Sequence, residues 1–104
     1  MSETPHTVAE IVTFRLVPGT DTVAFVHAAR ALEPRLRATG HVLSRTLSAD
    51  PDGTWTDHIV WTSHAVALQT AGEIMADPIA APMMQMIDPD HVQMRHAEIH
   101  YRQE

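Results

Sequence analysis

The sequence predicts an α+β protein of the ferredoxin-like type, in which a β-α-β-β-α-β order gives a four-stranded antiparallel sheet. Two observations lead to this fold class. Runs rich in β-branched and aromatic residues alternate with segments whose apolar residues recur at helical spacing. In addition, residues 53–68 pass from a turn glycine through an apolar strand into an alanine-rich helix. The 104 residues fit one domain, 1–104, whose first six residues we expect to be flexible.

The first half of the chain predicts a strand, a helix and a second strand. Residues 7–17 are β-branched and aromatic in character, and a Pro-Gly pair ends this first strand. Thr20 or Asp21 can cap a helix that extends to about residue 39. Pro34 predicts a kink or break in that helix, because proline lacks the N–H that a helix interior requires. Residues 41–49 then form a strand with Leu43 and Leu47 on one face.

The second half repeats the pattern after an Asp-Pro-Asp-Gly turn at residues 50–53, which makes the strand at 54–62 antiparallel to its predecessor. Thr62 or Ser63 caps a helix over residues 64–75. We expect its inward residues to be Ala67, Leu68, Ala71, Ile74 and Met75. A short helix over 79–87, broken near Pro82, leads to the last strand at 91–101. There the apolar positions change face near Arg95, which predicts either a β-bulge or a strand buried on both faces.

Apolar residues lie on both faces of the predicted strands. Ile11 lies opposite Val12 and Phe14, and Val60 lies opposite Trp61. Two helices can cover only one face of a four-stranded sheet, and monomers rarely expose large apolar patches. The sequence therefore predicts a homodimer.

Composition excludes several classes of protein. A net charge of −6, with scattered basic residues, argues against a nucleic-acid partner. The absence of cysteine excludes a thiolate nucleophile and a cysteine zinc site. No apolar run approaches the roughly 20 residues that cross a bilayer, so we expect no membrane partner. The polar start lacks the features of a signal peptide, and we expect a cytoplasmic protein.

Short motifs add a family resemblance. Pro18-Gly19 after the first strand, Gly40 before the second, and Trp61-Thr-Ser-His-Ala before an alanine-rich helix resemble the dimeric α/β-barrel superfamily. Within it the chain is similar to the small proteins grouped with antibiotic-biosynthesis monooxygenases. The resemblance implies a homodimer whose two sheets pack face to face. It also implies a small-molecule pocket between each sheet and its helices.

The resemblance further implies candidate activities. Some relatives oxidise polyketide quinol precursors without a cofactor and carry an amide and a tryptophan four residues apart on the third strand. Asp57 and Trp61 match that spacing, with an acid in place of the amide. Haem-degrading relatives require an asparagine, a residue that this sequence does not contain. The leading interpretation is oxidation of an aromatic or polyketide-like compound without metal or flavin. The alternative is a non-catalytic dimer that binds a hydrophobic small molecule or serves in a stress response.

Candidate site residues follow from strand alternation and side-chain chemistry. Asp57 and Trp61 share one face of the third strand, where an acid between apolar walls could accept a proton from a phenol. His27, on the first helix, is a second candidate base near neutral pH. The expected ligand-binding residues are Trp61, Phe14, Met75, Met83 and His96. The structural alternative is that Trp61 and the methionines fill the core, Asp57 lies at the solvated turn end and His27 lies at its boundary.

Eight histidines also raise the possibility of a metal site. His96, Glu98 and His100 share one face of the last strand, but the outer two lie about 13 Å apart along it. Three such side chains cannot converge on one ion with bonds of about 2 Å. Only a neighbouring pair together with a residue from another strand, such as Glu10 or His58, could do so. We expect no metal, and the family resemblance implies no other cofactor.

Overall fold

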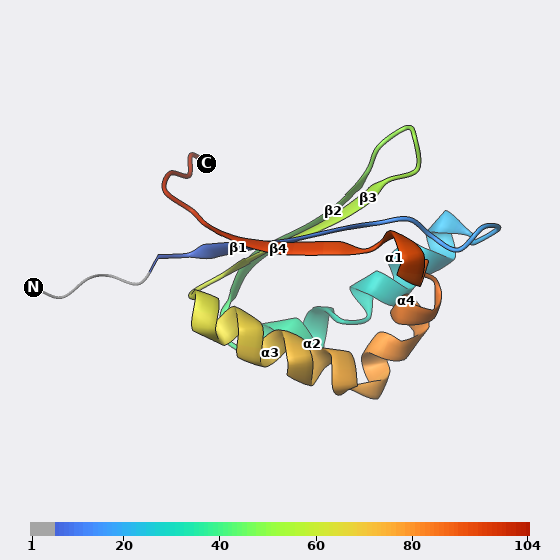
Figure 1. Ribbon diagram of the computed structural model, residues 1–104. Helices are drawn as coiled ribbons and strands as arrows, with labels where there is room; N and C mark the ends of the chain where they lie inside the picture. Colours follow the sequence, from blue (N-terminus) through green and yellow to red (C-terminus); the bar gives the residue numbers. More distant parts are fainter. Residues whose placement is uncertain (1–5) are drawn as a thin grey trace, which may run out of the picture.

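The structure is a computed structural model that describes residues 6–104. It contains one antiparallel sheet of four strands in the order β2-β3-β1-β4. The strands are β1 (Val8–Phe14), β2 (Val42–Ala49), β3 (Trp55–Trp61) and β4 (Gln93–Glu98). All the helices pack against the same side of the sheet (Figure 1). The α+β ferredoxin-like fold is thus confirmed, whereas the expected flexible start lies, except for His6, outside the described residues.

The helical segments begin and end where capping residues and prolines allow. They are α1 (Thr22–Arg30), α2 (Glu33–Arg37), α3 (His64–Ala76), η1 (Pro78–Ala80), α4 (Ala81–Gln85) and η2 (Pro89–His91). Asp21 caps α1 by accepting the backbone N–H of Val23 at 3.0 Å, and Ser63 caps α3.

The two prolines expected to interrupt helices each lie in the first turn of a new helix, α2 or α4. Pro34 lies in the first turn of α2, after α1 has ended, so the predicted break is confirmed. Pro82 lies in the first turn of α4, directly after η1 ends at Ala80, so the break expected near Pro82 is confirmed as well. Proline is tolerated in a first turn because its missing N–H would have no helical partner there.

The irregularity in the sheet lies in β2, and the bulge predicted near Arg95 is wrong. The β1–β4 pairing runs without a shift from Val8 opposite Glu98 to Thr13 opposite Gln93, so β4 carries apolar residues on both faces. The β2–β3 register instead shifts between Val42 and Ser44. Leu43, the extra residue, is 50 % exposed, whereas Leu47 packs against the core.

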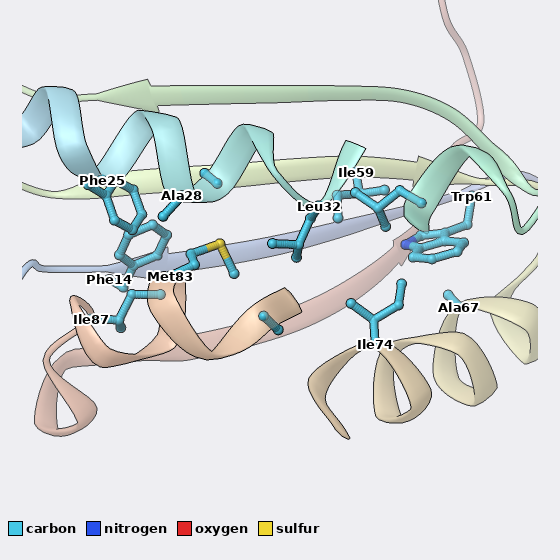
Figure 2. Packing of buried hydrophobic residues seen from close by; sticks show 13 residues of the cluster. Phe14, Phe25, Ala28, Leu32, Ile59, Trp61, Ala67, Ile74, Met83 and Ile87 are labelled. Atoms are coloured by element: carbon cyan, nitrogen blue, oxygen red, sulfur yellow. The ribbon is translucent and has the colours of Figure 1, made fainter. Parts of the chain in front are cut away.

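The core lies between the sheet and the helices (Figure 2). Helix α3 buries Ala67, Thr70 and Ile74, which follow one another at helical spacing. Leu68, also expected to point inward, is instead 56 % exposed, whereas Met75 lies at the edge of the core and is 45 % exposed. Residue 68 follows 67 by about 100° around the helix, which turns its side chain toward solvent.

The sheet face opposite the helices, here called the open face, is less apolar than the sequence indicated. The pairing places Ala9, Ile11 and Val60 on it together with Thr13 and His58. Strand β4 adds Ala97 beside Ala9 and Arg95 beside Ile11, so the apolar centre is small and lies among polar side chains. Within residues 6–104, no helix has the length and apolar character needed to cross a bilayer.

Candidate small-molecule site

A cavity of about 120 Å³ lies between the sheet and the helices. Its wall is mainly apolar and is built by β1, β3, α3 and the segment around α4. Three charged side chains, Glu10, Arg45 and Asp57, also reach it. A mostly apolar cavity with a few converging polar groups is typical of a small-molecule site.

Trp61 supplies an unsatisfied hydrogen-bond donor to this cavity. The residue is 1 % exposed, and its indole Nε1 is the only buried side-chain nitrogen or oxygen among the described residues without a partner. Figure 2 shows the indole between the sheet and α3, with its nitrogen edge facing the interior of the cluster. A buried donor left without an acceptor costs about 1–3 kcal/mol. The cavity therefore favours a ligand that brings an acceptor oxygen to this nitrogen.

Asp57 lies on the same face as Trp61, as expected from alternation, but it is not a free carboxylate among apolar walls. Both its oxygens accept hydrogen bonds from the Arg45 guanidinium, at 3.0 and 2.8 Å. Arg45 also donates to the carbonyl of Ala29, near the end of α1, at 2.7 Å. This ion pair is bidentate, and both side chains are largely buried. Together with the bond to Ala29, it links β2, β3 and α1 at one end of the cavity.

A second polar pair joins β1 to β4. Glu10 is 5 % exposed, and its Oε2 lies 3.2 Å from Nε2 of His96, the residue directly opposite it in the register. Glu10 lines the cavity, whereas His96, an expected ligand-binding residue, lies behind Glu10 rather than in the wall. His96 therefore contacts Glu10 but does not itself line the cavity.

The other expected ligand-binding residues all reach the cavity. Phe14 and Met83 are buried in its wall, and Met75 lines it from α3 while remaining partly exposed. His27 does not: its side chain is exposed and lines shallow grooves on the outer side of α1. The expectation that His27 faces the pocket is wrong, because α1 turns Phe25, Ala28 and Ala29 toward the sheet.

Sequence reasoning missed two of the three charged groups at the cavity. Glu10 shares the face of β1 that carries Val12 and Phe14, but the sequence reasoning did not include it among the candidate ligand-binding residues. Arg45 lies two residues before Leu47 and on the same face of β2, but nothing in the sequence paired it with Asp57. Among residues 6–104, no three histidine, aspartate or glutamate side chains lie close enough to hold a metal ion.

Comparison with solved structures finds the same fold in proteins of different activity. SnoaB, a cofactor-independent oxygenase from Streptomyces nogalater, matches with a TM-score of 0.60 at 15% identity, covering 95% of this chain and 96% of that one. A proposed antibiotic biosynthesis monooxygenase from Caulobacter crescentus has a TM-score of 0.67 at 11% identity, covering 92% of each chain. Hydroxynitrile lyase from Passiflora edulis has a TM-score of 0.62 at 13% identity, covering 96% and 99%.

These likenesses define the fold. The chain has the architecture of the antibiotic-biosynthesis-monooxygenase-like proteins, as its sequence motifs indicated. A scan against protein-family models finds no match, and a search of curated proteins finds none. Because the same architecture carries an oxygenase and a lyase, the activity has to be argued from the cavity.

Proposed function

We propose that the protein binds a compound with one aromatic ring and an oxygen acceptor in this cavity and oxidises it with dioxygen, without a metal or flavin. The observation that carries the proposal is the unpartnered indole N–H of Trp61 in an apolar wall. The fold shared with SnoaB, itself a cofactor-independent oxygenase, supports this chemistry.

Cavity size favours one ring over a fused polyketide. A dry protein cavity of roughly 150 Å³ accepts benzene, and the present one measures about 120 Å³. Its wall includes Met84 and Met94, which are 42 % and 53 % exposed, so a small substituent can extend toward the surface. Methionine is pliable and adapts to such substituents.

The donor role of Trp61 gives the first prediction. Trp61→Phe keeps an aromatic ring in the wall but deletes the N–H. We expect the affinity for phenol to fall roughly three- to tenfold, since a net hydrogen bond contributes about 0.5–1.5 kcal/mol. Toluene, which has no acceptor, should bind both proteins equally. Isothermal titration of the two ligands against the two proteins measures the difference; equal losses for phenol and toluene would mark Trp61 as a packing residue only.

One observation favours the alternative of a non-catalytic binding protein. The carboxylate of Asp57, the acid expected to take a substrate proton, is already engaged by Arg45 through both oxygens. Oxygen uptake on single-ring quinols distinguishes the two functions. If the quinol binds but oxygen is consumed no faster than in buffer, the protein is a binding protein and the oxygenase proposal is wrong.

The homodimer is a further part of the proposal. The helices cover one sheet face, and Ile11 and Val60 lie at the centre of the open face. We expect sedimentation velocity to report a particle of two chains at micromolar concentration. Ile11→Glu should convert it to single chains by placing a charge in the contact, whereas Ala76→Glu, at an exposed site on α3, should not. A wild-type protein that sediments as one chain would contradict the dimer.

A further inference from the structure

Glu10 and His96 have no evident structural task that an apolar pair could not perform. Their side chains are 7 % and 14 % exposed, and burying polar groups costs free energy that a hydrogen bond between them only partly offsets. The Arg45–Asp57 pair at least ties a helix to the sheet. The Glu10–His96 pair only joins two strands that the β-ladder already joins. A buried carboxylate at a cavity wall is typical of a site that moves protons.

The register places Glu10 beside the unpartnered donor. Val8 lies opposite Trp61 and Glu10 opposite Ile59, so Glu10 and Trp61 are diagonal neighbours on the helix-covered face. Diagonal neighbours in antiparallel strands lie about 7–8 Å apart. Both line the same cavity. One small ligand can therefore contact both the indole N–H and the carboxylate.

We propose that Glu10 is a catalytic base that removes a proton next to a carbonyl group of a ligand whose oxygen accepts the Trp61 N–H. The inference rests on the proposed binding of a ring compound in the cavity. In this step the C–H bond breaks, and its proton passes to a carboxylate oxygen of Glu10. The electron pair forms a C=C bond, and the negative charge moves to the ligand oxygen, where the indole N–H stabilises it. The substrate class is thus an aromatic compound that can form an enolate, the electron-rich species that dioxygen would attack.

His96 is a positioning residue for this base, and His64 extends the chain of groups toward solvent. The His96 and His64 rings lie 5.3 Å apart between centroids, and His64 is exposed at the first residue of α3. Imidazole exchanges protons readily near neutral pH. The line from Glu10 through His96 to His64 therefore gives the buried carboxylate a route by which its proton can return to water.

Deuterium exchange into acetophenone tests the inference without any need for oxidation. Acetophenone has one ring and a carbonyl oxygen, and loss of its methyl protons in D₂O is followed by proton NMR. We expect the wild-type protein to speed exchange at least about 100-fold over buffer, the lower range for a positioned general base. Glu10→Gln should return the rate to within about twofold of buffer while the dissociation constant changes less than about threefold. Glu98→Gln, which changes an exposed carboxylate on the neighbouring strand β4, is the matched control and should exchange like the wild type.

The outcomes separate this inference from the proposed function. If acetophenone, phenol and toluene all fail to bind, both proposals fall. If acetophenone binds but exchanges no faster than in buffer, or Glu10→Gln exchanges as fast as the wild type, only the assignment of the base falls. Exchange lost in Asp57→Asn but kept in Glu10→Gln would give the role to Asp57 instead. If Glu10→Gln does not fold, Glu10→Asp keeps the charge with a shorter reach and should exchange about tenfold more slowly; an unchanged rate would overturn the assignment.

The positioning role of His96 has its own readout in the pH profile of exchange. Other ionisable side chains lie on the elements around Glu10. His96 faces it from β4, and Glu98 lies two residues further along that strand. His64 approaches His96 from α3, and Asp57, paired with Arg45, lies on β3. His96→Gln removes the group that can carry positive charge beside Glu10. We expect the rise of the exchange rate to move to higher pH while acetophenone affinity stays within about threefold. A lower rate with an unshifted profile would mark His96 as structural and overturn its positioning role.

Discussion

Replacing Arg45 with methionine is expected to destabilise the protein by about 3–5 kcal/mol, because it leaves a buried carboxylate without its partner. Asp57 is 8 % exposed, and in the described structure both its oxygens are bonded to Arg45. The change also removes the hydrogen bond from Arg45 to the carbonyl of Ala29. Urea unfolding followed by circular dichroism measures the free energy of unfolding of each variant.

Two further variants show whether the loss of the Arg45–Asp57 ion pair causes the lower stability of Arg45→Met. Arg37→Met breaks the exposed ion pair between Arg37 and Glu33 on α2 and should cost less than about 1 kcal/mol. The double variant Arg45→Met/Asp57→Leu removes both charges and should recover most of the lost stability, because apolar replacements of buried ion pairs are often neutral. A loss below about 1 kcal/mol for Arg45→Met alone would mean that water reaches Asp57. The end of the cavity at Asp57 would then be open to solvent.

The fold could be predicted because its signals are local. The Asp50-Pro-Asp-Gly53 turn fixes the β2–β3 hairpin, and Gly53 adopts φ +92°, a conformation that favours glycine. Asp21 and Ser63 mark the starts of α1 and α3 because short side-chain oxygens cap helices in any fold. Alternation along β3 likewise placed Asp57 and Trp61 on one face before any pairing was known.

The charged part of the site could not be predicted, because it depends on contacts between distant segments. Glu10 and His96 are 86 residues apart in the chain and meet only when β4 pairs with β1. Arg45 meets Asp57 across the β2–β3 hairpin, where Arg45 pairs with Ile59 and Leu47 with Asp57, so the ion pair depends on the register that the hairpin adopts. A one-residue change of register moves every following side chain to the other face. The sequence therefore gives Asp57 as an isolated acid, whereas the fold makes it half of an ion pair.

The aromatic end of the cavity supports a second large effect. Phe25 is 0 % exposed, and its ring lies 5.5 Å from that of Phe14 and 5.1 Å from that of Trp55, both in edge-on contact. Phe25→Ala is expected to cost about 3–5 kcal/mol, since the surrounding side chains can fill only part of the space left behind. Chemical denaturation of Phe25→Ala and the wild type gives the difference directly.

Val23→Ala is the matched control for this change, because Val23 lies on the same helix but is 75 % exposed, and its removal should alter stability by less than about 0.5 kcal/mol. Loss of the Phe25 ring should also change the binding of ligands in the cavity. Phe14, which lines the cavity, rests on Phe25, so under conditions where Phe25→Ala is folded its affinity for toluene should differ from that of the wild type. A stability loss of 3–5 kcal/mol with toluene affinity unchanged would mean that Phe14 keeps its place without Phe25. The aromatic cluster would then hold α1 on the sheet while contributing nothing to the shape of the site.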